Sequence, residues 1–130
     1  MLNKIWDMQA QLNKTVGRDT IDGKDKELWL RDLSLAMSQE LSEFCDTLNW
    51  KWWSKEFKNH RVNAVMDRQN AKVELVDMMH FLVSMMQCMG MTPEDVYSVY
   101  KQKHAINLER QRNGYSHIGK TEEDNKTIVT

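Results

Sequence analysis

Proline, glycine and cysteine are all scarce in this sequence of 130 residues. A single proline and five glycines are few for the many tight turns of an all-β fold, which argues against that fold class. The two cysteines, Cys45 and Cys88, lie far apart and belong to no Cys-x-x-Cys motif. Neither a zinc site nor a disulfide framework is therefore predicted, and we expect both cysteines to be reduced packing residues.

An excess of positive charge and a long apolar run are also missing. The formal net charge is -1, so no overall positive field would draw the protein to nucleic acid or to an anionic membrane. The longest apolar stretch, around Phe81 to Met86, is far too short to cross a bilayer, and the first residues lack the core of a signal peptide. We therefore expect a cytoplasmic protein with no nucleic-acid or membrane partner, in which any phosphate binding is local.

Hydrophobic residues make up 41% of the sequence, and five Trp and ten Met supply enough apolar surface for a folded domain. Apolar positions recur at helical spacing, with no strand-like alternation of useful length. The predicted fold class is therefore all-α, a bundle of about four core helices near residues 2–16, 25–48, 63–89 and 93–112. Residues 1–115 are predicted to form one domain, and residues 116–130, which show no periodicity, a polar C-terminal tail.

The ends of the last two predicted helices carry specific signals. Gly90 closes the third helix, and Thr92 caps the fourth helix, which has Pro93 in its first turn. The third helix is apolar nearly all round beyond Val73, so it lies either at the centre of a bundle or in a subunit interface. Its surplus apolar face predicts a homodimer, in which the helices of two copies form a larger bundle.

Four acidic residues stand on helix faces that should be apolar. On a helical wheel Glu40 falls in the middle of the apolar arc of the second helix, with Glu43 at its edge. Glu74 and Asp77 share one face of the third helix. A single buried acid would be explained by a pairing with Arg or Lys. Two such acid pairs on two helices favour a divalent cation, and all-oxygen ligands suit Mg²⁺ or Mn²⁺.

A competing metal hypothesis involves His80, because Asp77-x-x-His80 resembles the Glu-x-x-His motif of di-iron bundles. Di-iron sites need this motif on two helices, whereas the second helix here offers Glu40-x-x-Glu43. A lone histidine in a Met-rich helix is more often a core or interface residue. The all-carboxylate hypothesis is therefore the stronger of the two.

One face of the fourth helix changes from apolar to polar and basic. It begins with valines and a tyrosine and continues with Lys103, Asn107 and Arg110. Arg offers a fork of donors to phosphate oxygens and Lys a point charge, so this face is suited to a polyphosphate. The alternative is that these side chains are counter-ions of the acids. The sequence has no Gly-rich phosphate loop, so side chains and a metal ion would have to bind the phosphates.

Two further groups of residues are suited to binding a nucleobase. Trp50, Trp52 and Trp53 follow the second helix and form either a stacking wall for a base or apolar anchors for the end of the bundle. Gln9 and Asn13 lie one turn apart on an otherwise apolar helix face, where they offer paired donors and acceptors for a base edge. The alternative for each amide is a polar core residue with satisfied hydrogen bonds.

Nearly the whole chain resembles the dimeric dUTPases, the all-α metal-dependent group within the larger MazG-like nucleotide pyrophosphohydrolase superfamily. The resemblance is carried by MQAQLN in the first helix, ELSEFCDTLNWKWWSK across the second helix and its connector, NAKVELVDMMHF in the third helix and KHAINLERQRNGY in the fourth. The WKWW and K-x-x-x-N-x-x-R-Q-x-x-G-Y patterns are more specific than the paired acids, which the whole superfamily shares.

The resemblance implies a role for each group of residues. It implies that Mg²⁺ is held by the four acids Glu40, Glu43, Glu74 and Asp77. Phosphate and sugar contacts are implied for Lys103, Asn107, Arg110 and Tyr115. A base pocket is implied for Gln9, Asn13, Trp50, Trp53 and Asn70.

We therefore predict a homodimeric enzyme that hydrolyses dUTP, and also dUDP, to dUMP with Mg²⁺, or with Mn²⁺ in its place. Glu43 and Glu40 are the predicted catalytic residues, with Glu43, nearer solvent, as the base that deprotonates the attacking water. A related all-α pyrophosphohydrolase that acts on dCTP or on a damaged or non-canonical nucleotide would share the acids. A non-catalytic helical interaction protein, with the Met-rich third helix as its contact face, is the alternative from another class, and metal-dependent turnover would exclude it.

Overall fold

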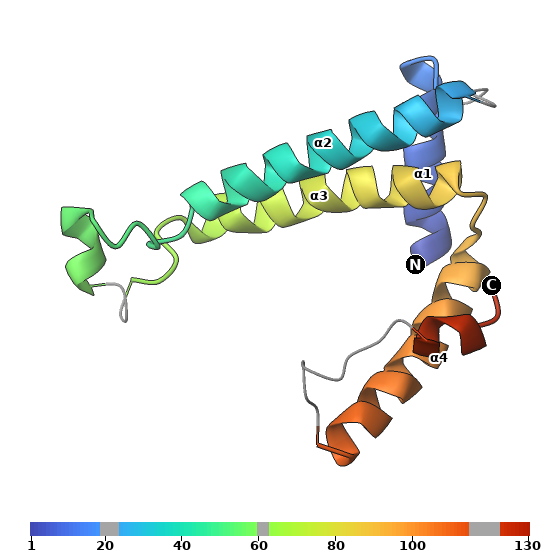
Figure 1. The fold of residues 1–130 in the computed structure, drawn as a ribbon. Helices are drawn as coiled ribbons and strands as arrows, with labels where there is room; N and C mark the ends of the chain where they lie inside the picture. Colours follow the sequence, from blue (N-terminus) through green and yellow to red (C-terminus); the bar gives the residue numbers. More distant parts are fainter. Residues whose placement is uncertain (19–23, 60–62, 115–122) are drawn as a thin grey trace. The chain divides into compact units, whose positions relative to one another are not determined.

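The computed structural model describes residues 1–18, 24–59, 63–114 and 123–130 (Figure 1). These residues form α-helices and two short 3-10 helices, η1 (Lys55–Asn59) and η2 (Glu123–Thr127), and they contain no β-strand beyond one isolated bridge. This confirms the all-α class. The chain divides into two compact units, one of residues 1 and 3–89 and one of residues 2 and 90–130. None of the helices described is both long and apolar enough to span a membrane.

The first helix, α1 (Leu2–Thr15), buries two polar residues where an apolar stripe would be expected. Gln9 and Asn13 are its buried side chains, with exposed fractions of 5% and 9%. Both amides form hydrogen bonds with side chains of α3 (Arg68–Cys88). Polar contacts therefore contribute directly to the attachment of α1 to this unit.

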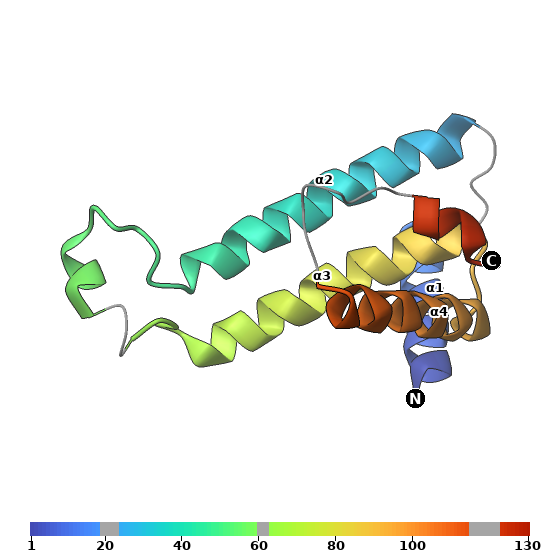
Figure 2. The same cartoon turned by 60° about the horizontal axis from the view of Figure 1, so that its bottom comes forward.

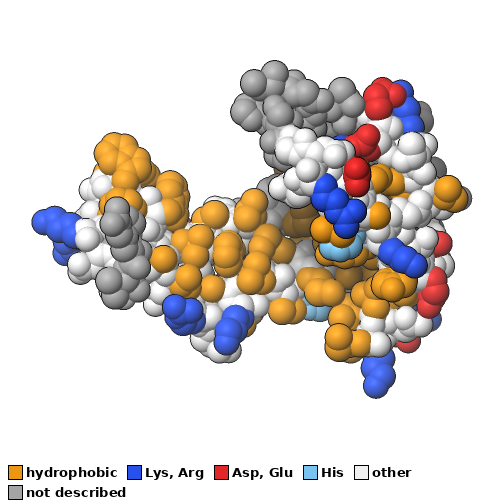
Figure 3. Space-filling model, turned by 90° about the horizontal axis from the view of Figure 1, so that it is seen from below, with side chains coloured by type: hydrophobic (Ala, Val, Ile, Leu, Met, Phe, Trp, Pro, Cys, Tyr) orange, Lys and Arg blue, Asp and Glu red, His pale blue; other side chains and the backbone are white. Residues whose placement is uncertain are grey.

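The helix α2 (Lys24–Asp46) runs beside α3 in the opposite direction, as both ribbon views show (Figures 1 and 2). Few apolar side chains of this pair are buried, Leu33 and Val83 most completely. Others on α3 are about half exposed, among them Leu75 and Val76. Apolar side chains accordingly gather on the surface over the helix pair (Figure 3). This is the surplus apolar face that the sequence predicts for α3.

The connection between α2 and α3 is longer than predicted, because both helices are shorter at this end. The helix α2 ends at Asp46, two residues earlier than expected, and α3 begins at Arg68, five residues later. The reason for the late start is Asp67, whose carboxylate caps the first turn of α3. An antiparallel bridge between Leu48 and Val65 joins the two ends of the connection. The backbone hydrogen bonds there run between the two segments instead of along a helix.

In the second unit, α4 (Pro93–Arg112) begins with the predicted cap. The Thr92 hydroxyl accepts a hydrogen bond from the backbone N–H of Asp95, and the Asp95 carboxylate accepts one from the backbone N–H of Thr92, which completes a capping box. Gly90 has a φ of 76°, the left-handed conformation that favours glycine after a helix. Both predicted helix-end signals are therefore confirmed.

The C-terminal residues contact α4 through side chains. Gln102 exchanges two hydrogen bonds with the backbone of Val129, at 2.9 and 3.0 Å. Arg110 forms an ion pair of 2.6 Å with Asp124. Part of the predicted polar tail is thus bound to α4 through η2 and the residues after it, while residues 115–122 lie outside the described part of the chain.

Candidate active site

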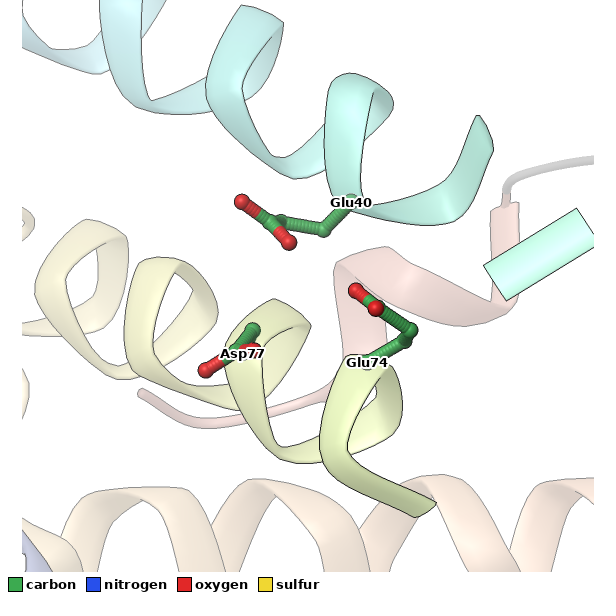
Figure 4. A group of neighbouring side chains, drawn as sticks. All are labelled: Glu40, Glu74 and Asp77. Atoms are coloured by element: carbon green, nitrogen blue, oxygen red, sulfur yellow. The ribbon is translucent and has the colours of Figure 1, made fainter. Parts of the chain in front are cut away.

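Three carboxylates from α2 and α3 lie close together where the two helices face each other (Figure 4). Glu40 belongs to α2, and Glu74 and Asp77 lie about one turn apart on α3. Each offers one oxygen, and these oxygens all lie within 4.8 Å of one another. Within the described ranges no ion pair joins any of the three to Lys or Arg. Basic partners therefore do not account for this cluster.

Burial and repulsion between the carboxylates both disfavour the charged form of Glu40. Desolvation raises the pKa of Glu40 above its ordinary value, and the negative charges of Glu43, Asp77 and Glu74 raise it further. Glu74 is only 7% exposed, so water screens its charge poorly. A divalent cation would supply the missing positive charge, and carboxylate oxygens are ligands that Mg²⁺ and Mn²⁺ prefer. The three residues therefore fit a metal ion of this kind.

The fourth predicted ligand, Glu43, is not part of this three-residue group. It lies one turn after Glu40 on α2, its side chain is exposed, and its Oε1 accepts a hydrogen bond of 3.1 Å from Gln39 Nε2. Its charge still acts on Glu40, as the raised pKa of that residue shows. Glu43 thus occupies the solvent side of the cluster, and its roles as ligand and base stay predictions.

A pocket of about 610 Å³ adjoins the acids within the first unit. Glu40 and Asp77 line one part of it, and Gln9 and Asn13 of α1 line another. Its volume lies within the range of about 300–1,000 Å³ that is typical of small-molecule sites. The structure therefore brings two predicted groups, the metal acids and the base-reading amides, to one pocket.

The amides in this pocket form a connected hydrogen-bond network with α3. Gln9 Nε2 donates to Asn13 Oδ1 at 3.0 Å and to Ser84 Oγ at 2.8 Å. Asn13 Nδ2 donates to Gln87 Oε1 at 3.0 Å, and Gln9 Oε1 lies 2.7 Å from His80 Nδ1. The amides are therefore polar residues with satisfied hydrogen bonds that also line a pocket, and their base-reading role stays a prediction.

Arg18, Trp29 and Ser84 also line the pocket, although the sequence patterns did not indicate them as site residues. The Arg18 guanidinium carbon lies 4.9 Å from the centroid of the Trp29 ring, a cation–π contact at the pocket wall. Ser84 is 2% exposed and lies among the methionines of α3. The position of Trp29 on the apolar face of α2 is typical of a core residue, so only Ser84, a small polar residue in an apolar helix, offered a signal.

The predicted base-binding residues of the connector lie away from this pocket. Trp50 and Trp53 pack edge to face, with ring centroids 5.6 Å apart, and about half of each side chain is exposed. Asn70 is exposed in the first turn of α3. None of the three lines the pocket beside the acids. The structure does not bring these three residues to the pocket, and their base-binding role stays a prediction.

The predicted phosphate-binding residues belong to the second unit, where the C-terminal segment contacts them. Lys103 Nζ donates to Asn125 Oδ1 at 2.6 Å, and Arg110 is paired with Asp124. Asn107 is exposed on α4, and Tyr115 lies outside the described residues. The phosphate and sugar roles of this group stay predictions.

The fold and the site together define a class: an all-α protein in which a carboxylate cluster suited to a divalent cation lies beside a pocket of small-molecule size. The sequence profile of a protein family described as dUTPase matches residues 1–88 and 84–115 of this chain. The chain therefore belongs to the dUTPase family, and the resemblance inferred from its motifs is confirmed.

Several phage proteins are similar to this chain. A dCTP pyrophosphatase of Enterobacteria phage T4 is 29% identical over 67% of this chain and 61% of its own length. A dCTP pyrophosphatase of Enterobacteria phage LZ5 is 27% identical over 67% and 60%, and a DNA replication protein of phage T4 is 26% identical over 62% and 25%. The chain thus spans about three fifths of the length of the dCTP pyrophosphatases that it matches. No solved structure matches it.

Proposed function

We propose that this protein hydrolyses dUTP to dUMP and pyrophosphate, and dUDP to dUMP and orthophosphate, with Mg²⁺ as its cofactor. The observation that carries the proposal is the pocket in which Glu40 and Asp77 adjoin the amides of Gln9 and Asn13. Carboxylates that fit a cation and amides that offer donors and acceptors are the two elements needed to bind a nucleoside polyphosphate. Membership of the dUTPase family supports the same conclusion.

Glu40, Glu74 and Asp77 would hold the metal ion, and Mn²⁺ would serve in its place. When bound, such an ion offsets the negative charge of the phosphate oxygens during hydrolysis. Side chains of the protein orient the attacking water and accept its proton. Glu43, exposed beside the cluster, orients a water molecule and takes its proton on a carboxylate oxygen as the water attacks the phosphoanhydride.

The phosphates and the sugar are assigned to the predicted residues of α4 and the residues after it. Lys103 and Arg110 bind phosphate oxygens, and Asn107 and Tyr115 contact phosphate or sugar. The contacts of Lys103 with Asn125 and of Arg110 with Asp124 show that these two side chains already bind oxygen acceptors. A phosphate would take the place of those acceptors. Trp50, Trp53 and Asn70 are retained as proposed contacts of the base.

Hydrolysis of dCTP is the second candidate function. The observation that favours it is the name of two relatives, the dCTP pyrophosphatases of phages T4 and LZ5, at 29% and 27% identity. Cytosine and uracil have nearly the same shape, so the volume of the pocket does not distinguish them. Discrimination would depend on hydrogen bonds to the base edge.

We also propose that the protein acts as a homodimer, in which two copies pair through the exposed apolar face of α3. About half of the side chain of Leu75 and of Val76 is exposed in the single chain. A monomer rarely leaves such a contiguous apolar surface open to water.

The test is a panel of dUTP, dUDP, dCTP and UTP, each incubated with Mg²⁺ and analysed by chromatography. We expect dUMP from both dUTP and dUDP, because Lys103 and Arg110 supply phosphate contacts that do not require a third phosphate. A matched reaction in EDTA should give no product. Preferential cleavage of dCTP would transfer the assignment to the second candidate, and no turnover of any nucleotide would favour the non-catalytic interaction protein.

A further inference from the structure

The backbone carbonyl of Trp6, at one end of the amide network, determines which end of each amide donates and which accepts. Gln87 Nε2 donates to the backbone carbonyl oxygen of Trp6 at 2.8 Å. A carbonyl oxygen can only accept a hydrogen bond, so the NH₂ end of the Gln87 amide must face Trp6. The Oε1 end therefore faces Asn13 and accepts from its Nδ2 at 3.0 Å.

This direction continues through the next two side chains. Because Asn13 Nδ2 faces Gln87, Asn13 Oδ1 faces the other way, where it accepts from Gln9 Nε2 at 3.0 Å and from Ser84 Oγ at 3.1 Å. Gln9 Nε2 also donates to Ser84 Oγ at 2.8 Å, so both hydrogens of this amide have acceptors. A flipped Gln9 would place two carbonyl-type oxygens against each other. Gln9 Oε1 must therefore face His80.

The last contact of the network defines the state of the histidine ring. Gln9 Oε1 lies 2.7 Å from His80 Nδ1, and an amide oxygen carries no hydrogen to donate. The hydrogen of this bond must therefore be on Nδ1. We propose that His80, as the Nδ1–H tautomer, is a positioning residue that holds the Gln9 amide in this orientation from the end of the network opposite Trp6, and thereby helps to set which pyrimidine base the pocket accepts.

The locked orientation leaves specific groups for a ligand. Asn13 Nδ2 uses one of its two hydrogens on Gln87, and Gln9 Oε1 uses one of its two lone pairs on His80. Among the residues that the structure describes, no other group bonds to these atoms, so one donor and one acceptor remain on amides that line the pocket. Uracil and cytosine differ only in the donors and acceptors of one ring edge, so reversal of either amide changes which edge is matched. This step rests on the proposed function, since it takes the ligand to be a pyrimidine nucleotide.

The first experiment measures the tautomer in the ligand-free protein by long-range proton–nitrogen NMR of the imidazole rings. Spectra are recorded in alkaline buffer so that the neutral ring is observed, and the His80 signals are assigned by their loss in the variant His80→Asn. We expect the hydrogen on Nδ1, although free histidine prefers Nε2. A hydrogen on Nε2 would overturn the inference. Because no turnover is involved, this result is independent of the proposed function.

The second experiment compares two nearly isosteric variants of the same residue. His80→Asn keeps an N–H donor that can replace Nδ1, whereas His80→Asp places oxygen acceptors against Gln9 Oε1 and so opposes the wild-type orientation of that amide. The readout is the ratio of kcat/KM for dUTP to that for dCTP, in which any effect of the added charge on both substrates cancels. We expect this ratio to change by about tenfold or more in His80→Asp and by less than about threefold in His80→Asn.

The outcomes distinguish failure of the positioning role of His80 from failure of the proposed nucleotide hydrolysis. Equal ratios in the wild type and both variants, or an equal change in both variants, would overturn the positioning role of His80. If the wild type hydrolyses neither nucleotide, the proposed function and the specificity role that rests on it both fail, while the NMR result still decides the orientation of the amides. An Nδ1–H tautomer together with a ratio that only His80→Asp changes would support the inference in full.

Discussion

At the scale of single residues, charge repulsion lowers the stability of the metal-free protein. The residues concerned are Glu40, Glu74 and Asp77. Their oxygens lie within 4.8 Å of one another, and no basic side chain in the described part of the chain is paired with them. Repulsion between partly buried carboxylates is destabilising, so stability does not account for the cluster, whereas the proposed metal ion would.

The substitution Glu74→Gln should remove metal binding and activity while the fold is kept. The amide has the shape of the carboxylate but lacks the charge of a strong ligand, and loss of comparable electrostatic groups in other enzymes costs about 10²–10³ in rate. Calorimetric titration with Mg²⁺ and a turnover assay measure the two effects. Glu43→Gln is the matched comparison, because loss of the base should lower kcat and leave metal affinity nearly unchanged. Wild-type turnover in Glu74→Gln would exclude the carboxylate cluster as the active site.

The stability of the metal-free protein should fall as the pH rises above the ordinary carboxyl pKa of about 4.3. Burial and the neighbouring acids raise the pKa of Glu40, so the folded state holds this proton more tightly than the unfolded state. The folded state therefore binds more protons between the two pKa values, and the contribution of Glu40 to the free energy of unfolding decreases with pH in that window. Urea unfolding in EDTA at a series of pH values measures this dependence.

Glu40→Gln is the control for this pH dependence, because an amide has no carboxyl proton to lose. The slope of the free energy of unfolding against pH should be smaller in this variant, and addition of Mg²⁺ to the wild type should reverse the loss of stability by binding the ionised cluster. An identical slope in the wild type and in Glu40→Gln would show that repulsion at Glu40 is not significant.

At the scale of secondary-structure elements, the C-terminal segment that includes η2 contacts the face of α4 to which phosphate binding is assigned. The ion pair between Arg110 and Asp124 joins a largely buried guanidinium, 19% exposed, to a carboxylate that is 42% exposed. A carboxylate and a phosphate offer the same kind of oxygen acceptor to arginine. The segment therefore competes with substrate for Arg110 if Arg110 binds phosphate.

The substitution Asp124→Asn should lower KM for the nucleotide by up to about fivefold, because a partly exposed ion pair is worth up to about 1 kcal/mol. Steady-state kinetics measures KM and kcat, and kcat should change little. Glu123→Gln is the matched control, since it removes the same charge from the same segment but from a residue paired with Lys126. A raised KM in Asp124→Asn would instead show that the segment assists substrate binding.

At the scale of the whole molecule, apolar side chains of α3 are exposed in the described part of the chain. Leu75, Val76 and Leu82 of α3 are 51%, 53% and 40% exposed. A second copy that packed on this helix would remove that surface from water, and each Å² of apolar area contributes about 25 cal/mol. The proposed homodimer would thus complete a core that one chain leaves open.

Light scattering coupled to size-exclusion chromatography should report a dimer at micromolar concentration. Val76→Arg should shift the protein toward the monomer, because it introduces an unpaired charge into the proposed interface. Tyr97→Arg is the control, since Tyr97 is also exposed, at 68%, but lies on α4. A wild-type monomer at this concentration would show that the apolar face of α3 has another partner.

The sequence by itself determined those features that depend on neighbours a few residues apart. Helical periodicity identified the class, and the signals at Thr92 and Gly90 marked helix ends that the structure confirms. The same periodicity brought out Glu40, Glu74 and Asp77 as acids on apolar faces. These inferences succeeded because a cap or a helical face is defined within about one turn of chain.

Only the tertiary structure decided which distant groups meet. Ser84 and Gln87 are more than 70 residues from the amides of α1 that they contact, and nothing local predicts that pairing. The contacts of Arg18 with Trp29 at the pocket wall and of Asp124 with Arg110 join residues that are closer in sequence, but helical periodicity does not predict them either. The direction of an amide or the tautomer of a histidine depends on partners supplied by other helices, because only packing determines which donor faces which acceptor.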